Sequence, residues 1–511
     1  MRPPQPFKPF ALTLLDQAYG KVFFHYSLSF NVQDENRALQ AISQGIDELL
    51  ALLPFLTGEM APHPDANGTL EVRPATSEQK TPMLKVQRHA NCFLPVRKIG
   101  QGPGAFRVPQ NFPLNDRFNP LPSLHAADQP APIVRFQANL LEDGVVLTTG
   151  FNHLVFDAIG GSVIVGILAD LCRNPGSADG QRGSAIMARE LFLRKQVEDL
   201  ISRVKSDHAH GVITKSLTSG DETTETASAP AYTASAPPQP VKDECLVFAG
   251  ERIEQLRGFC NSILPWLDRQ QQQVSEKEEV VDKPRRVSSI SGNDVLSALI
   301  CESIERARRL KGPRPDCMLG VDARGFLNPP FPENYMGNAG LPLCFQLQSS
   351  SSSAPEQETS SSLPQELLET AQAHGLTLDM PSLLTIAKSA YTIQAGLSNF
   401  HNTSVDSLLS FINAGTSGAK QKADPAPRPP CTILSTLRPV KFHEMHFGPD
   451  LGGIQTFETG VPWLDGACMV LPLCVFSPET VHLAPWSVRI ALYQDVMQRL
   501  KSDSAIVWAL Q

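Results

Sequence analysis

Residues 151–161, FNHLVFDAIGG, form the most informative segment of the sequence. It places His153 directly after a run of β-type residues, and Asp157 follows four residues later. Gly160 and Gly161 then precede an apolar segment of helical length. A histidine held in a turn between a strand and a buried helix is rigidly placed, and its unperturbed pKa of about 6.5 lets it accept a proton near neutrality. The two glycines allow backbone or substrate to approach closely.

The pattern H-x-x-x-D-x-x-G occurs a second time, as HFGPDLGG at residues 446–453, so the pattern alone does not identify a catalytic base. In this second match Gly448 and Pro449 lie between the histidine and the aspartate, which favours an irregular loop. We therefore predict that His153 is the reactive histidine. The alternative is a core histidine bonded to a backbone carbonyl.

Strand and helix signals alternate along the chain on both sides of this stretch. Apolar and β-branched runs predict strands over 23–32, 133–136, 144–151 and 318–321. Apolar residues at helical spacing predict helices over 38–53, 161–172, 190–204, 293–309 and 488–501.

Polar, low-complexity segments divide the chain. Residues 214–240 are mostly Ser, Thr, Ala and Pro and contain too few aliphatic residues to fold by burial, so we predict a flexible linker. Similar stretches near 268–286, 349–362 and 415–430 predict solvated inserts. We expect an N-terminal half over 1–204, a crossover over 205–245, and a C-terminal half over 246–511.

Composition excludes several classes of protein. The chain has 511 residues of which 41% are hydrophobic, which is enough for a folded core. A net charge of −8 without a basic block argues against nucleic-acid binding. The ten cysteines show no C-x-x-C spacing, so we expect reduced thiols and no metal site. The prolines near the N-terminus and the shortness of every apolar run argue against a signal peptide and a membrane span, so we expect a cytoplasmic protein.

Taken together, six segments resemble the BAHD-type acyltransferases, in the fungal branch that includes trichothecene 3-O-acetyltransferase. Besides HLVFDAIGG, these segments are LLDQA at 14–18, PFLTGE at 54–59, SGNDVLSAL at 291–299, VDARGFLNPPFPENYMGN at 321–338 and HFGPDLG at 446–452. They follow the family's order along nearly the whole chain. The second signature departs from the family, because His446 replaces its opening Asp and Asp450 replaces a Gly.

The resemblance implies an α/β fold of two chloramphenicol-acetyltransferase-like domains. Each domain is a mixed β-sheet with flanking helices, and the active-site channel runs between them. The family binds no permanent cofactor or metal and forms no acyl-enzyme. It uses acyl-CoA, here expected to be acetyl-CoA, as co-substrate together with a small hydroxylated metabolite. We expect a monomer.

The resemblance also implies roles for individual residues, with His153 as the catalytic base. Asp157 is expected to pair with Arg324 of the second half, and the alternative is that it orients the imidazole. Gly160 and Gly161 are expected to be structural. Two sets of residues have both a local and a functional interpretation. Asn293, Asp294 and Ser297 cap a helix or line the CoA channel, and Tyr335 and Asn338 form a turn or line the tunnel. The second signature loop, which holds His446, Phe447, Gly448, Pro449, Asp450 and Gly452, is expected to support structure.

The function these features favour is an acyl-CoA-dependent O-acyltransferase acting on a hydroxyl of a fungal secondary metabolite. The alternatives are N-acylation, transfer of a longer acyl chain, and a non-catalytic descendant that binds a small molecule. His446 and Asp450 keep the last alternative open. A serine hydrolase is disfavoured because the sequence has no G-x-S-x-G elbow.

Overall fold

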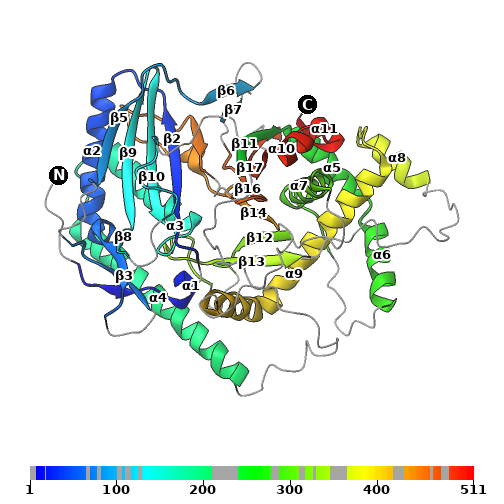
Figure 1. Ribbon diagram of the computed structural model, residues 1–511, viewed down its shortest axis with the longest axis horizontal. Coiled ribbons are helices and arrows are strands. Elements are labelled where there is room, and N and C mark those ends of the chain that lie inside the picture. The colour runs from blue at the N-terminus through cyan, green and yellow to red at the C-terminus, as the bar shows by residue number, and fades with distance from the viewer. Residues whose placement is uncertain are drawn as a thin grey trace.

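The computed structural model describes residues 7–17, 19–64, 69–76, 82–99, 106–109, 117–124, 129–209, 240–277, 287–309, 317–325, 330–345, 365–417, 431–460, 464–473 and 483–510. Two separate β-sheets with flanking helices dominate the described chain, and they lie side by side (Figure 1).

A five-stranded sheet in the order β15-β2-β10-β9-β5 forms the framework of the first half. Its strands are β2 (Phe23–Phe30), β5 (Leu84–Arg88), β9 (Val134–Leu141), β10 (Gly144–Asn152) and β15 (Thr456–Glu458). The helices α2 (Glu35–Leu52), α3 (Ala158–Arg173) and α4 (Gly180–Ala209) accompany it. The smaller elements are β1 (Phe10–Ala11), α1 (Leu14–Gln17), the 3-10 helix η1 (Pro54–Thr57), β3 (Glu59–Pro62), β4 (Leu70–Arg73), β6 (Val96–Ile99), β7 (Phe106–Pro109) and β8 (Ala131–Pro132).

Helix α2 illustrates how the sequence produces these elements. The side chain of Asp34 accepts hydrogen bonds from the backbone N–H groups of Asn36 and Arg37, which satisfies donors that the first turn leaves free. Apolar side chains then recur at spacings of three and four, so that one face of the helix is buried against the sheet and α3.

The second half contains a six-stranded mixed sheet in the order β11-β17-β16-β14-β12-β13. Its strands are β11 (Val241–Phe248), β12 (Cys317–Asp322), β13 (Gly340–Phe345), β14 (Thr432–Thr436), β16 (Ala467–Val470) and β17 (Trp486–Tyr493). The helices of this half are α5 (Gly250–Ser262), α6 (Leu264–Lys277), α7 (Gly292–Arg308), α8 (Gln365–Ala373), α9 (Met380–Ser417), α10 (Gln494–Leu500) and α11 (Ser504–Leu510), and the 3-10 helix η3 (Phe442–Glu444) precedes β15.

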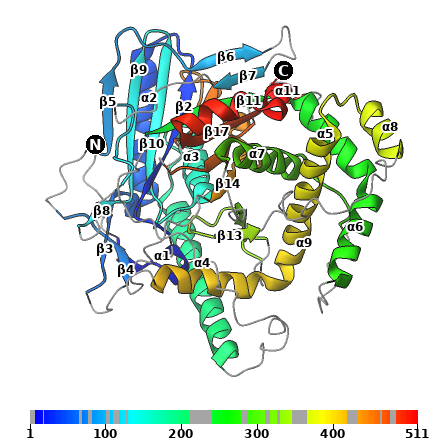
Figure 2. The same ribbon diagram turned by 45° about the vertical axis from the view of Figure 1, so that its right-hand side comes forward.

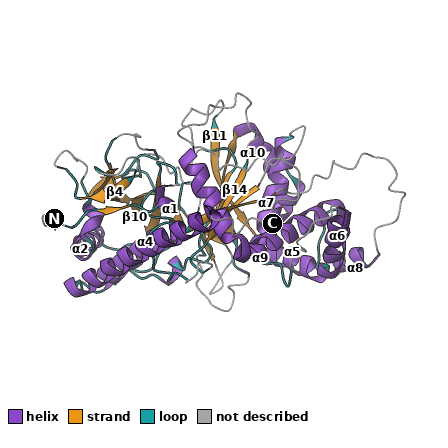
Figure 3. Ribbon diagram, turned by 90° about the horizontal axis from the view of Figure 1, so that it is seen from below, coloured by secondary structure: helices purple, strands orange, loops and turns teal. Residues whose placement is uncertain are grey.

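Two elements of the second half, β15 and α9, contact the first half at the boundary. Strand β15 comes late in the sequence, yet it pairs antiparallel with β2 of the first sheet. Helix α9 runs along α7 and β13 and also contacts α1 and α4 (Figure 2). Seen from below, α4 runs out of the first half, while α5, α6 and α8 gather at the far end of the second (Figure 3). The two halves therefore meet over a broad interface, and residues that lie near each other at this interface are far apart in the sequence.

The expected helix over 488–501 is wrong in its first part. Residues Trp486–Tyr493 form β17, which lies between β11 and β16, and the helix begins only at Gln494. Val488, Ile490, Ala491 and Leu492 are all fully buried, because both faces of this strand are covered. A short strand buried on both faces has a continuous apolar pattern, and that pattern does not distinguish it from a buried helix.

Two of the polar segments also differ from expectation. The insert expected over 268–286 is helical as far as Lys277, and Asp268 is buried where it accepts a hydrogen bond from the Tyr391 hydroxyl at 2.7 Å. The crossover expected over 205–245 begins inside α4 and ends inside β11. The predicted linker over 214–240, apart from residue 240, and the insert over 349–362 lie outside the described residues, as does 418–430 of the last insert.

None of the described helices combines the length and the apolar character that crossing a bilayer requires. Across the same described residues, no group of three or more His, Cys, Asp or Glu side chains is arranged to hold a metal ion.

Candidate active site

His153 lies in the turn between β10 and α3, where the first half faces the second. Its backbone N–H donates to the Val22 carbonyl at 3.0 Å, which fixes the turn against the start of β2. Its ring stacks on Tyr19 with centroids 4.6 Å apart, and the edge of Phe24 meets it at 5.2 Å. Burial lowers the pKa of the imidazole below 6.5, and the nearby Asp157 carboxylate opposes this more weakly. The ring is therefore neutral at physiological pH.

Asp157 caps α3 and does not face the imidazole. Its Oδ1 accepts hydrogen bonds from the Gly160 N–H at 2.8 Å and from Arg324 Nη2 at 2.9 Å. Its Oδ2 accepts from the Ala339 N–H at 2.8 Å. Both carboxylate oxygens are thus committed to the helix N-terminus and to the second half, an arrangement that joins the two halves.

Arg324 supplies the other side of this contact and is one of the largest fully buried side chains described. It donates to Asp322 Oδ1 at 2.8 Å and to the carbonyls of Tyr335 and Gly337 at 3.0 and 2.9 Å. Burial alone would lower the pKa of Arg324, but the adjacent carboxylates of Asp157 and Asp322 raise it. The guanidinium stays charged and anchors residues 335–339, here called the seam loop, against the first half.

The two glycines of the motif allow this close contact. A Cβ on Gly160 would lie 1.9 Å from the Met336 carbonyl oxygen of the seam loop, which is impossible without moving the backbone. A Cβ on Gly161 would lie 3.1 Å from the ring of Phe24, one of the walls around His153. The first glycine is therefore required for the approach of the two halves, whereas a Cβ at the second would only crowd Phe24 and Tyr26.

A buried polar network that the sequence analysis did not identify holds the seam loop from the other side. Arg194 of α4 donates to Asp16 Oδ2 at 2.7 Å and to Glu190 Oε1 at 3.1 Å. Glu190 in turn accepts the Met336 N–H at 3.0 Å, and Asp16 accepts both the N–H and the side-chain amide of Asn338 at 3.1 and 2.9 Å. Asp16 lies in the segment LLDQA, so the family resemblance contained a signal for it, whereas Glu190 and Arg194 lie in an ordinary amphipathic helix.

The remaining predicted channel residues have different surroundings. Tyr335 is fully buried between the guanidinium groups of Arg194 and Arg324 and packs on Phe331.

At the start of α7 the N-cap is Ser291, and Asp294 completes a capping box with it. Ser297 is buried in the helix, and Asn293 has a buried Oδ1 without a hydrogen-bond partner. The helix-cap interpretation therefore accounts for Asp294, although the capping residue is Ser291 and not one of the three predicted.

The second signature loop lies near the C-terminal end of α3, one helix length from His153. A Cβ on Gly448 would contact the backbone of Cys172 and Arg173, the last residues of that helix. Since α3 has 16 residues, the two motifs are separated by about 24 Å of helix.

Local contacts hold the second signature loop in place. Phe447 is fully buried against Phe30, and His446 Nδ1 accepts the Gly448 N–H at 3.1 Å. Asp450 forms an ion pair with Arg37 at 2.9 Å. Pro449 is exposed, and Gly452 has a left-handed φ of +74°.

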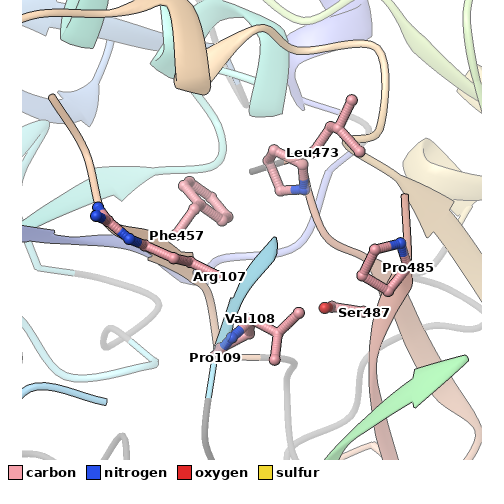
Figure 4. A pocket seen from close by; sticks show the side chains of 8 residues that line it. Arg107, Val108, Pro109, Phe457, Leu473, Pro485 and Ser487 are labelled. Atoms are coloured by element: carbon pink, nitrogen blue, oxygen red, sulfur yellow. The ribbon is translucent and has the colours of Figure 1, made fainter. Parts of the chain in front are cut away.

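A small hollow, partly open to solvent, lies at the boundary of the halves away from the seam loop (Figure 4). It is lined by β7 and by Phe457 of β15 on the side of the first sheet, and by Leu473 and Ser487 on the side of the second. Three prolines also line it: Pro109, Pro472 and Pro485. None of the predicted site residues lines it.

Comparison with solved structures identifies the class of protein that this two-sheet fold defines. The crystal structure of F. sporotrichioides TRI101 complexed with coenzyme A and T-2 superposes with a TM-score of 0.61 over 98% of this chain and 99% of that one, at 16% identity. The expected fold, two chloramphenicol-acetyltransferase-like domains of the BAHD type, is confirmed.

The chain belongs to the Transferase family, whose model matches residues 108–372. A second model, the trichothecene 3-O-acetyltransferase-like N-terminal domain, matches residues 18–172. The fumigaclavine B O-acetyltransferase of Aspergillus fumigatus is 30% identical over 99% of this chain and 98% of its own length. An O-acetyltransferase of Aspergillus campestris is 28% identical over 99% and 97%. The family resemblance predicted from the motifs is confirmed.

Proposed function

We propose that this chain transfers an acyl group, expected to be acetyl, from acyl-CoA to a hydroxyl of a fungal secondary metabolite, with His153 as general base. The observation that carries the proposal is the state of His153: its ring lies between two aromatic side chains at the boundary of the halves, and burial lowers its pKa. A neutral imidazole in that position is the group that the reaction needs.

The reaction proceeds by direct attack. His153 takes the proton of the acceptor hydroxyl while its oxygen bonds to the thioester carbonyl carbon, giving a tetrahedral oxyanion and an imidazolium. When the oxyanion collapses, the C–S bond breaks and the imidazolium returns the proton to the departing CoA thiolate. Holding both substrates in one channel removes the entropic cost of their encounter from the chemical step.

Asp157 supports this chemistry at a distance. Its carboxylate raises the pKa of His153 against the larger effect of burial, so it favours the imidazolium that forms in the transition state. Because both of its oxygens are bonded elsewhere, we assign it to joining the halves and not to orienting the ring.

The acceptor and donor classes are supported by the relatives. Two of them are named as O-acetyltransferases, which favours oxygen over nitrogen as the acceptor atom. The similar TRI101 structure contains coenzyme A and T-2, which supports acyl-CoA as donor and a small metabolite as acceptor. We further propose that Asn293, with its unpartnered Oδ1, is available to a substrate in the channel.

The test uses the purified chain with acetyl-CoA and a panel of hydroxylated fungal metabolites, each paired with an amine analogue. Mass spectrometry detects the acetylated product, and release of free CoA gives the rate. We expect O-acetyl products from the wild-type chain and from His446→Ala, and none above background from His153→Ala. Acetylation of the amines alone would overturn the choice of oxygen. Binding of acetyl-CoA without transfer to any acceptor would support a non-catalytic descendant.

A further inference from the structure

The side chain of Tyr19 connects the imidazole of His153 to the second half of the molecule. Its ring lies against the His153 ring, with centroids 4.6 Å apart and planes inclined by only 22°. Its hydroxyl donates to the backbone carbonyl of Gly340, the first residue of β13. Burial raises the pKa of Tyr19 well above its ordinary value, so the hydroxyl keeps the proton that this bond needs. One side chain therefore covers the imidazole and is itself held at its far end.

The backbone on both sides of Tyr19 is fixed as well. The Tyr19 N–H donates to the Asp16 carbonyl at 3.3 Å, and the Val22 carbonyl accepts the His153 N–H at 3.0 Å. The segment between α1 and β2 therefore contacts the turn of His153 through both main chain and side chain. Phe24, the other aromatic wall, has a different geometry: its ring is inclined by 68° to the imidazole and borders it without stacking.

We propose that Tyr19 is a positioning residue whose stacked ring fixes the plane of the His153 imidazole and favours the imidazolium that forms when the base takes the hydroxyl proton. The face of an aromatic ring carries partial negative charge and attracts a cation lying over it, more strongly where water is excluded. Neutral imidazole gains less from the same face, so the contact is stronger in the transition state and acts on kcat. This inference rests on the proposed function of His153.

The hydroxyl bond gives the stacked ring its fixed orientation. Gly340 directly follows the seam loop, whose Ala339 N–H is held by Asp157 at 2.8 Å. The tether of Tyr19 is therefore attached to backbone that the contact between the halves already holds in place. A general base whose ring is held in one plane keeps the alignment that proton transfer requires.

The first measurement needs no substrate. A stacked aromatic ring shields the protons of the ring beneath it, so the Hδ2 and Hε1 signals of His153 should lie upfield of their ordinary positions. Proton–carbon spectra of histidine-labelled protein record these signals, and their absence from His153→Gln assigns them. Unshielded His153 ring protons in the wild-type chain would overturn the proposal even if every Tyr19 variant failed to fold.

The second measurement compares Tyr19→Phe with Tyr19→Leu. Phe keeps the aromatic face and loses only the hydroxyl, so kcat should fall by no more than about threefold. Leu removes the face, so the shielding should disappear and kcat should fall by about 10-fold or more, while KM for acetyl-CoA changes little. A spacer that only fills volume would not distinguish the two variants in this way. Equal losses of kcat in both, or a wild-type kcat in Tyr19→Leu, would remove the positioning role.

Phe118→Leu is the matched control, because it removes a similar stack from another histidine of the first half. The rings of Phe118 and His89 have centroids 4.1 Å apart and planes inclined by 18°. This variant should leave the His153 ring protons and kcat as they are in the wild type. A loss of kcat equal to that of Tyr19→Leu would show that the effect is not specific to the stack on His153, and would overturn the proposal.

Gly340→Ala tests the tether from the second half. A Cβ on Gly340 would lie 2.9 Å from the Tyr19 hydroxyl oxygen, so the tyrosine side chain must move to make room. We expect the His153 ring protons to shift and kcat to fall. The double variant with Tyr19→Phe should lose less than the sum of the two single losses, because phenylalanine has no hydroxyl to displace. Strictly additive losses of kcat would contradict the tether.

The proposed function is tested separately. A wild-type chain that acetylates no acceptor would overturn the transferase assignment. The ring-proton shifts of the wild type, Tyr19→Leu and Phe118→Leu would still decide whether Tyr19 holds the imidazole.

Discussion

The same eight-residue pattern occurs at two places in this chain, and their surroundings differ in every respect that matters for chemistry. At the first match His153 is walled by Tyr19 and Phe24 and lies between a buried strand and a buried helix. At the second match His446 is exposed, and its Nδ1 is occupied by the N–H of Gly448. The same motif therefore indicates a candidate catalytic site only where the surrounding strand and helix bury and position its histidine.

The two aspartates of the pattern differ in the same way. Asp157 pairs across the halves with an arginine that is only 2% exposed, whereas Asp450 pairs with Arg37, which is 67% exposed. Removing one partner of a buried pair leaves an uncompensated charge, while an exposed pair contributes little. The second loop keeps its shape through backbone hydrogen bonds and the buried ring of Phe447. His446, which replaces the Asp of the family's motif, still provides a hydrogen-bond acceptor, because its Nδ1 accepts the N–H of Gly448.

The largest expected difference between the two matches is in rate. His153→Ala should lower kcat by at least 10²–10⁴-fold, the contribution of a well-placed general base, whereas His446→Ala should retain most of the activity. Both variants should bind acetyl-CoA as the wild type does. Product formation in single-turnover experiments checks this, and survival of transfer in His153→Ala would reverse the assignment.

The next effect is on folding. Asp157→Ala and Arg324→Ala should each lower the free energy of unfolding by about 3–5 kcal/mol, because each leaves the other charge buried and unpaired. The double variant should lose less than the sum of the two single losses. Urea titrations of the three proteins measure the coupling. Strictly additive losses would contradict the pairing. An Asp157→Asn variant of normal stability with collapsed turnover would place Asp157 among the catalytic groups instead.

Much of the first match was predictable from sequence, since strand, turn, histidine and helix are consecutive along the chain. The pairing of Asp157 with Arg324 followed from the family resemblance alone, because 167 residues separate the partners. Glu190 and Arg194 were not predictable, since charged residues on an amphipathic helix look the same whether they face solvent or another domain. The error over 488–501 has a similar origin, because β17 is apolar throughout where it lies between β16 and the distant strand β11, and a buried helix can have the same apolar pattern.

A smaller effect is expected from the backbone of the second loop. Gly452 has a φ of +74°, and a Cβ there would meet no atom within 4 Å. Gly452→Ala should therefore cost only the strain of a left-handed conformation, about 1–2 kcal/mol, and leave kcat unchanged. Gly160→Ala, which places a Cβ against the Met336 backbone, is the contrasting variant and should be far less stable. Equal losses in the two variants, measured by thermal unfolding, would contradict the difference drawn between the loops.

The smallest effect is expected from Asp450→Asn. The ion pair with Arg37 is exposed and screened by salt, so its loss should change the free energy of unfolding by no more than about 1 kcal/mol and should matter less at high ionic strength. Denaturant titrations at two salt concentrations measure this. A loss comparable to that of Asp157→Ala would show that the two aspartates are equivalent after all.

The pH dependence of kcat/KM tests most directly whether a buried, neutral His153 is the base. Because burial lowers its pKa, the ring becomes protonated only below pH 6.5, and protonation removes the lone pair that accepts the hydroxyl proton. We expect a plateau near neutrality and an acidic limb whose midpoint lies below 6.5, with circular dichroism confirming that the protein stays folded there. An acidic limb at or above 6.5, or the same limb in the residual activity of His153→Ala, would contradict it.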